Sequence, residues 1–264
     1  MSLSNLALAL QSLYECNGGI GTLTKAISLH HEALALCPTP HPDRSRSLNN
    51  LALALQSLYK CNNSVGTLTE AISLYHEALG LSPAPHPDCS RLLNNLANAL
   101  QSLHECNGGI GTLTKAISLY REALGLCPAP HPNCSLLLNN LANALQSLHE
   151  CTGGIGTLTE VISLHRDALE LRPAPHPDRS VSLNNLANVL QSQFKQSGGV
   201  DVLNELISLR RELLVIWTPG HIYRQYAVQQ LAVLLEKQHD ATGDDQDWGE
   251  IDDLKAELAA LSRL

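Results

Sequence analysis

The sequence predicts an all-α fold, a right-handed α-solenoid of about six helix-turn-helix repeats with a period of 45 residues. The segment Leu-Asn-Asn-Leu-Ala begins at Leu48 and returns 45 residues later each time, at Leu93, Leu138 and Leu183. Apolar residues on both sides of this segment recur at helical spacing, and clusters of glycine or proline interrupt them at the same period. A fixed period of about 20–50 residues is typical of stacked repeats, in which each unit contacts only its neighbours.

The first helix of a repeat is predicted from about Asp43 to Cys61. Proline and aspartate precede it, and aspartate can cap a helix N-terminus. Its apolar stripe comprises Leu48, Leu51, Ala52, Leu55, Leu58 and Tyr59. Glycine or asparagine follows the helix in each unit and tolerates the left-handed conformation that ends a helix. We therefore expect positive φ at or beside Gly18, Asn63, Gly108 and Gly153.

The second helix is predicted to begin near Thr67, because Thr67-Leu68-Thr69-Glu70 has the spacing of a capping box. Its apolar positions are Leu68, Ala71, Ile72, Leu74, Tyr75, Ala78, Leu79 and Leu81. The segment 83–87 then contains three prolines, which cannot continue a helix. We expect this connection to be stiff and extended.

The same unit can be followed along the whole chain, which we interpret as one solenoid over residues 1–264. The predicted repeats are 1–42, 43–87, 88–132, 133–177, 178–220 and 221–264. The last one is degenerate but in register, since His221 follows His176 by 45 residues. Its second helix, near Trp248 to Leu261, is more charged, as expected of a capping repeat.

Charge and hydropathy exclude several classes of partner. Residues 1–239 carry 17 acidic and 15 basic side chains, so there is no basic stripe for a nucleic acid. Residues 240–253 carry seven acidic side chains and no basic one, and we expect the loop 240–247 to be solvated. No apolar run is long enough to span a membrane, and the N-terminus has no basic start typical of a signal peptide.

The eight cysteines follow the repeat as well. Cys16, Cys61, Cys106 and Cys151 are 45 residues apart, and Cys89 and Cys134 form another such pair. Equivalent positions in successive repeats lie about one helix-packing distance apart, too far for a disulfide. We therefore expect free thiols and a cytoplasmic, reducing location.

The second helix carries a pattern that resembles the tetratricopeptide repeat. Ala71, Tyr75, Ala78, Leu79 and Pro83 have the family's spacing. The following repeat keeps it with Ala116 and Tyr120, and the first repeat keeps it with His30 at the aromatic position. The loop His-Pro-Asp followed by Leu-Asn-Asn-Leu-Ala is similar to the longer repeats of kinesin light chains and of fungal arrays. Such fungal arrays often precede a caspase-like or nucleotide-binding module, so the resemblance allows for an effector domain in a longer parent protein. It also implies that the first helices line a concave surface and the second helices a convex one.

Asparagine and glutamine form the candidate binding site, because they recur on one face of the first helices. A side-chain amide donates and accepts hydrogen bonds without adding charge, so a row of amides suits the main chain of an extended peptide. The candidate groove residues are Asn49, Asn50, Asn94, Asn95, Asn98, Gln101, Asn139, Asn140, Asn143, Gln146, Asn184, Asn185, Asn188 and Gln191. The alternative is a structural role, in which these amides bond to the neighbouring helix or turn and hold the repeats together.

Other polar residues favour structure over chemistry. His41, His86, His131, His176 and His221 recur every 45 residues and cannot converge on a metal, so we expect them to anchor loops by hydrogen bonds. Catalysis needs a unique and asymmetric cluster, and every cysteine–histidine pair here repeats with the period. We therefore expect no enzyme activity, no metal and no cofactor.

Two function hypotheses follow. The first is a protein-interaction scaffold that holds an extended peptide of a protein partner in a polar and weakly charged groove. The second is a structural one, either a spacer or sensor arm of a larger signalling protein or a self-associating array.

Overall fold

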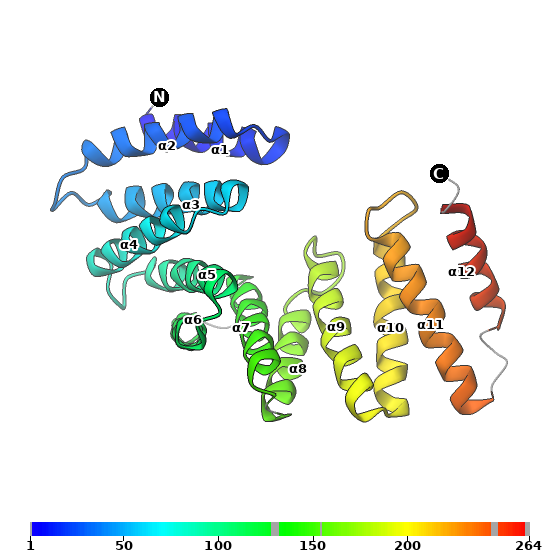
Figure 1. Cartoon of the computed structure of the whole chain (residues 1–264). Coiled ribbons are helices and arrows are strands. Elements are labelled where there is room, and N and C mark those ends of the chain that lie inside the picture. Colours follow the sequence, from blue (N-terminus) through cyan, green and yellow to red (C-terminus); the bar gives the residue numbers. More distant parts are fainter. Residues whose placement is uncertain (1, 128–131, 154, 244–247, 262–264) are drawn as a thin grey trace. The chain divides into compact units, whose positions relative to one another are not determined.

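A computed structural model of the chain describes residues 2–127, 132–153, 155–243 and 248–261. In these residues the chain forms twelve α-helices that follow one another in pairs, which confirms the all-α prediction (Figure 1). The helices are α1 (Leu3–Asn17), α2 (Ile20–Ala35), α3 (Arg44–Asn62), α4 (Val65–Leu81), α5 (Cys89–Asn107), α6 (Ile110–Gly125), α7 (Pro132–Thr152), α8 (Ile155–Glu170), α9 (Arg179–Ser197), α10 (Val200–Ile216), α11 (Arg224–Thr242) and α12 (Trp248–Leu261). They divide into two compact units, residues 1–151 and 152–264.

In the first unit the antiparallel pairs α1/α2, α3/α4 and α5/α6 stack in chain order. Each second helix packs on the first helix of the next pair, as α2 does on α3 and α4 on α5. The backbone of α3 also approaches those of α1 and α5. No comparable approach joins α2 to α4 or α4 to α6 in the part of this unit that the structure describes. The first helices therefore lie together along one side of the stack.

The core of each repeat combines small and large side chains from both helices. Ala52 and Ala97 on the first helices and Ala71 and Ala116 on the second are completely buried, which lets the helices approach closely. Tyr75 and Tyr120, also completely buried, fill the space left beside these alanines. Burial of each leucine of the apolar stripe contributes about 1.5–3 kcal/mol. These residues bear out the stripes expected from their spacing.

The helix ends agree only partly with expectation. All four predicted turn positions have positive φ, at 69° for Gly18, 50° for Asn63, 69° for Gly108 and 73° for Gly153. The capping-box prediction is wrong, since α4 begins two residues before Thr67. The Thr69 hydroxyl instead donates to the carbonyl oxygen of Val65 at 2.6 Å, because Thr69 lies one helical turn after Val65.

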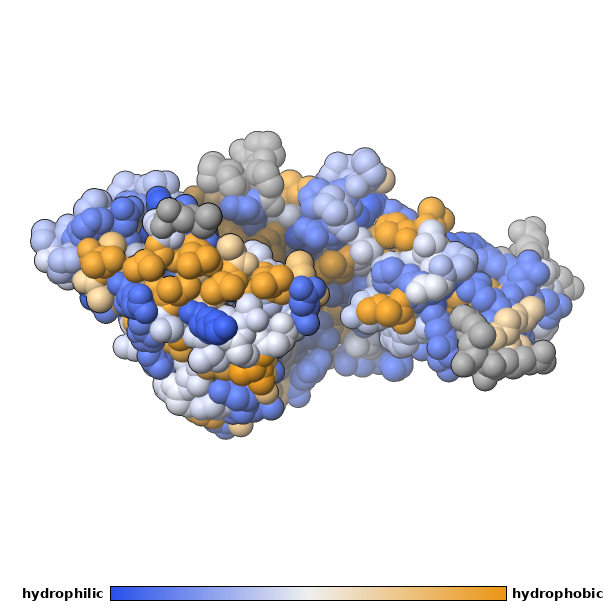
Figure 2. Space-filling model, turned by 90° about the horizontal axis from the view of Figure 1, so that it is seen from above, coloured by the Kyte–Doolittle hydropathy of each residue, from blue (hydrophilic) through white to orange (hydrophobic). Residues whose placement is uncertain are grey.

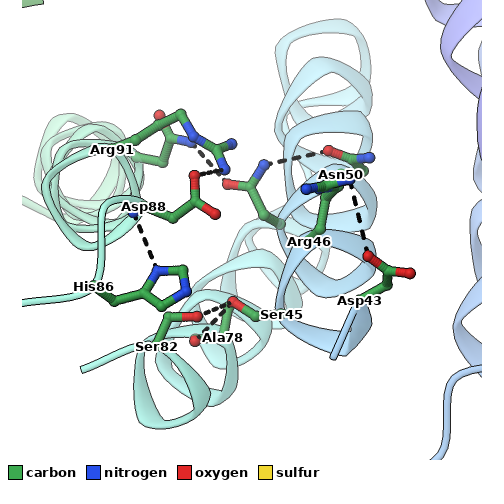
Figure 3. A network of polar contacts seen from close by, with 11 residues as sticks. Asp43, Ser45, Arg46, Asn50, Ala78, Ser82, His86, Asp88 and Arg91 are labelled. Atoms are coloured by element: carbon green, nitrogen blue, oxygen red, sulfur yellow. Dashed lines mark hydrogen bonds and ion pairs between the residues drawn. The ribbon is translucent and has the colours of Figure 1, made fainter. Parts of the chain in front are cut away.

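The proline-rich connections form consecutive turns and are not extended. In the loop before α5, the N–H of His86 donates to the Pro83 carbonyl at 2.9 Å, and the N–H of Cys89 donates to the His86 carbonyl at 2.9 Å. The same bonds recur in the loop before α3. Buried Ser45 ties the loop to the helices, because it donates to the Ala78 carbonyl at 3.0 Å and accepts from Ser82 at 2.8 Å (Figure 3).

Histidine anchors these turns, as expected. The Nδ1 atom of His86 accepts a hydrogen bond from the backbone N–H of Asp88 at 3.2 Å, which Figure 3 shows beside the Asp88–Arg91 ion pair. His41, His176 and His221 accept the equivalent bond from the residue two positions later. Asp43 and Asp88 stand at the N-cap positions, but their carboxylates make no capping bond. His131 lies outside the described residues, and so does most of the acidic loop 240–247, of which 244–247 are not described.

An arginine clasp closes three of the loops. The Arg44 guanidinium donates to the Cys37 carbonyl at 3.0 Å and pairs with Glu77 on the next second helix at 2.6 Å. Arg179 and Arg224 repeat this arrangement 135 and 180 residues later along the sequence, with Glu212 and Glu257 as their acidic partners. The clasp links each loop to the helix pair that follows it.

The cysteine prediction needs a correction at one loop. Cys127 and Cys134, which stand where Cys37 and Arg44 form the first clasp, are joined by a disulfide with a Cα–Cα distance of 6.0 Å. Equivalent cysteines of successive repeats are too far apart to bond, whereas this bridge joins two positions across a single loop. Six further cysteines are free thiols: Cys16, Cys37, Cys61, Cys89, Cys106 and Cys151.

In the second unit α8 packs on α9, and α9, α10 and α11 each pack on the next helix in the chain. The last helix buries Ile251 and Leu254 and exposes Asp252, Asp253 and Lys255. Its outer face is therefore polar.

The first helix of the first unit has an apolar outer face. Leu6 is 41% exposed, although its equivalents Leu51 and Leu96 are completely buried under the preceding helix pair. Leu8 and Leu13 are 42% and 47% exposed. Figure 2 looks down on this end of the first unit, and apolar surface covers a broad part of it.

Candidate functional site

The first asparagine of two pairs, Asn49 and Asn94, joins consecutive repeats. The Asn95 amide donates to Oδ1 of Asn49 at 2.9 Å, and the Asn140 amide donates to Oδ1 of Asn94 at 2.9 Å. Asn49 is completely buried and Asn94 is 6% exposed. Such burial leaves almost no surface for a bound peptide, so these oxygens act within the stack.

Asn139 occupies the same buried position in α7. Its amide donates to the Ser135 carbonyl one turn earlier at 3.0 Å, and the residue is 3% exposed. The second asparagine of each pair, Asn50, Asn95 and Asn140, is only half-buried. In the first unit the structure thus separates the predicted groove residues into a buried set and an accessible set.

A buried tyrosine of the second helix holds the accessible amides in place. The Tyr120 hydroxyl donates to Oδ1 of Asn98 at 2.6 Å and approaches Oε1 of Gln101 at 3.2 Å. In the preceding repeat, Tyr75 donates to Oε1 of Gln56 at 2.5 Å. Burial raises the pKa of both tyrosines, so they remain neutral donors.

This contact orients the carboxamide. Because the oxygen of Asn98 is turned towards Tyr120, its NH₂ group points the other way. The first helix therefore presents N–H donors on the side away from the core. Sequence reasoning found the amides but missed the tyrosine that orients them, although the tyrosine recurs with the same period.

The accessible amides of the first unit line a hollow of about 400 Å³, here called the polar hollow. Its lining includes Asn95, Asn98, Gln101, Asn140 and Asn143, all on the predicted list, and also Gln56, Ser57 and Ser102. Lys60 and Glu105 are also part of the lining, both on exposed positions. One charge of each sign makes the hollow polar but weakly charged. Gln146 lies outside this lining, and its amide donates to Glu150 at 3.1 Å.

A second hollow, about 490 Å³ in volume, lies in the second unit and is here called the aromatic hollow. Its lining includes three predicted residues, Asn184, Asn185 and Asn188, and four aromatic ones, Trp217, His221, Tyr223 and Tyr226. Trp217 stacks on His221 with ring centroids 5.4 Å apart. Gln191 contacts Gln230 on α11 through a hydrogen bond of 2.8 Å and lies outside this lining.

Arg210 takes the place of the buried tyrosine in the second unit, since it follows Tyr120 by 90 residues in the sequence. Its guanidinium donates to Oδ1 of Asn184 at 3.0 Å and to Oδ1 of Asn188 at 2.9 Å. The side chain is completely buried, and burial lowers its pKa. Arg210 was not among the predicted site residues, although the tyrosine present at Tyr75 and Tyr120 is visibly missing at this position of the sequence.

In the residues that the structure describes, no group of three or more histidine, cysteine, aspartate or glutamate side chains is close enough to hold a metal ion. Within the same residues, no helix is long and apolar enough to cross a membrane.

Comparison with solved structures shows the same fold. TPR-like repeats of the kinesin light chain type from Podosopora anserina are 21% identical, with a TM-score of 0.57 over 81% of this chain and 95% of that one. BtubC (BKLC) from P. vanneervenii is 17% identical, with a TM-score of 0.60 over 91% and 92% of the two chains. A thermophilic TPR protein of Thermus thermophilus is 18% identical, with a TM-score of 0.57 over 88% and 98%.

A search of curated proteins finds no match for the sequence. The family model for the tetratricopeptide repeat matches residues 45–88, 90–133 and 180–223, together half of the chain. Each match spans one predicted first helix, its second helix and the following loop. The chain therefore belongs to the tetratricopeptide repeat family.

Proposed function

We propose that this protein is an interaction scaffold that holds an extended peptide segment of a protein partner along the amides of its first helices. Tetratricopeptide repeat proteins generally mediate protein–protein interactions. The observation that carries the proposal here is the polar hollow, in which Asn95, Asn98, Gln101, Asn140 and Asn143 lie together.

The orientation of the amides supports a peptide backbone as the ligand. Because Tyr120 takes the oxygen of Asn98, the free NH₂ group is suited to a peptide carbonyl. Neighbouring first helices are about 10 Å apart, which matches about three residues of an extended chain. A peptide lying across the helices would then meet one amide group at about every third residue.

The proposal is tested by replacing the amides with the residue that the array itself uses elsewhere. Leu53 stands 45 residues before Asn98, and there the buried tyrosine bonds to glutamine alone. Asn98→Leu and Asn143→Leu should therefore preserve helix packing while removing two donors. We expect the double variant to bind a peptide selected by display on the native chain at least tenfold more weakly, because two hydrogen bonds are lost.

Lys60→Ala is the matched control, since it changes the rim of the same hollow and leaves the amides in place. It should alter affinity less than threefold and leave thermal unfolding unchanged, and the double variant should still unfold cooperatively. Full affinity in the double variant would exclude the polar hollow as the peptide site.

We also propose a cytoplasmic location, supported by the six free thiols, with the Cys127–Cys134 bridge as the exception.

Self-association is a second candidate function, and the exposed face of α1 favours it. Leu6, Leu8 and Leu13 form an apolar surface where later repeats are covered by a preceding helix pair. The same surface would serve a spacer or sensor arm that continues into further repeats or into an effector domain.

A further inference from the structure

Arg210 is a buried cation whose partners in the described residues are all uncharged. Its guanidinium bonds to the amide oxygens of Asn184 and Asn188 and approaches that of Gln191 at 3.5 Å. Its Nε atom is buried and has no hydrogen-bond partner. The Tyr226 ring covers it at 5.4 Å from the guanidinium carbon. A buried charge is costly unless an opposite charge compensates it.

The aromatic hollow borders this arginine. Three residues that line the hollow, Asn184, Asn188 and Tyr226, also contact Arg210. Guanidinium has donors only, so the amide oxygens must face it and the NH₂ groups must face away. The hollow therefore receives two amide donors and the field of one uncompensated positive charge.

No acidic side chain belongs to the described lining of this hollow, which consists of serine, valine, asparagine and aromatic residues. An incoming anion would thus meet no local carboxylate. The polar hollow differs in the charge of the buried side chains that orient its amides, because Tyr75 and Tyr120 are neutral. Charge complementarity consequently distinguishes the two hollows.

We propose that the aromatic hollow binds an acidic side chain of an extended peptide, whose carboxylate accepts hydrogen bonds from Asn184 and Asn188 above the charge of Arg210. The proposal rests on the proposed function and adds a preference for one residue class at one place in the array. The stacked Trp217 and His221 rings form the wall against which the stem of the acidic side chain packs.

The test uses two blocked peptides, acetyl-Ala-Ala-Glu-Ala-Ala-amide and its glutamine counterpart. Their binding to the full chain is followed by NMR through the indole N–H of Trp217, in a Trp248→Phe background that removes the other tryptophan. A third peptide, with glutamine at the centre and a free C-terminal carboxylate, distinguishes a chain terminus from a side chain. We expect the glutamate peptide to bind about tenfold more tightly than either of the other two peptides. Attraction between its carboxylate and the Arg210 charge several ångströms away accounts for a difference of this size.

Arg210→Tyr is the matched variant, because tyrosine occupies this position in two other repeats and still orients the amides. It should abolish the preference for glutamate, whereas Arg210→Lys should retain most of it. The converse variant Tyr120→Arg should create a glutamate preference at the polar hollow, read from the side-chain amide resonances of Asn98. This converse variant keeps the test valid even if Arg210→Tyr does not fold.

Equal binding of the glutamate and glutamine peptides, or an unchanged preference in Arg210→Tyr, would overturn the inference while leaving peptide binding intact. A preference for the free C-terminal carboxylate would overturn it as well. If neither hollow binds any of the three peptides or the display-selected one, the proposed function fails together with it.

Discussion

Tyr120 in α6 donates its hydroxyl hydrogen to Oδ1 of Asn98 in α5, over a distance of 2.6 Å. The bond crosses from the second helix to the first helix of one repeat and fixes an amide that lines the polar hollow. The same buried position is occupied by His30, Tyr75, His165 and Arg210 in four of the other repeats. Side chains that a ligand cannot touch thus set which polar atoms the first helices present to it.

Tyr120→Phe should destabilise the first unit and weaken peptide binding together. Removal of the hydroxyl leaves the oxygen of Asn98 without its donor, which costs about 1–2 kcal/mol. The freed carboxamide can also rotate, so the orientation of its NH₂ group is lost. Urea unfolding and peptide titration of the same variant measure the two effects.

Tyr14→Phe is the control for this prediction. The Tyr14 hydroxyl contacts the sulfur of Cys61 at 2.7 Å in an exposed setting. Its loss should change the unfolding free energy by less than about 0.5 kcal/mol. Equal effects of the two substitutions would show that the buried bond to Asn98 contributes nothing specific.

The sequence was sufficient for the repeat, the helix pairs, the turn positions and the histidine anchors, because each depends on local chemistry repeated at one period. Thr67 was misread as an N-cap because the capping-box spacing of Thr67 and Glu70 also fits residues that already lie inside the helix. The Cys127–Cys134 bridge was missed because it depends on how one loop folds back on itself. Arg210 was missed because only the packed structure shows that it reaches Asn184 and Asn188.

His165 makes stability depend on pH. Burial lowers its pKa from 6.5 to about 4, so the folded protein binds this proton less readily than the unfolded chain. Unfolding then takes up a proton below pH 6.5, and stability falls as pH drops from 6.5 to about 4, by up to roughly 3 kcal/mol. His165→Tyr, which copies Tyr120, should flatten this dependence in urea unfolding at a series of pH values. His76→Gln changes an exposed histidine and should leave the dependence as in the native chain.

Arg224 should contribute more to stability than Arg211, although both pair with a glutamate. Arg224 pairs with Glu257 at 2.6 Å and also donates to the carbonyls of Leu214 and Trp217 at 2.8 and 2.6 Å. Its side chain is 15% exposed, whereas the side chain of Arg211, which pairs with Glu250, is 44% exposed. We expect Arg224→Ala to cost about 2–4 kcal/mol and Arg211→Ala less than about 1 kcal/mol in chemical unfolding. Similar costs would mean that the carbonyl bonds of the clasp do not add stability.

The apolar face of α1 predicts association that depends on concentration. Leu6 is 41% exposed at a position where Leu51 and Leu96 of later repeats are completely buried, and Leu13 beside it is 47% exposed. Because apolar area removed from water is worth about 25 cal/mol per Å², two such faces gain free energy when they meet. Light scattering at two concentrations should show a larger mass at the higher one, and Leu6→Glu with Leu13→Glu should restore the monomer. Leu36→Glu, at a residue 70% exposed beyond the end of α2, is the control and should change nothing. A native chain that stays monomeric at both concentrations would exclude self-association through this face.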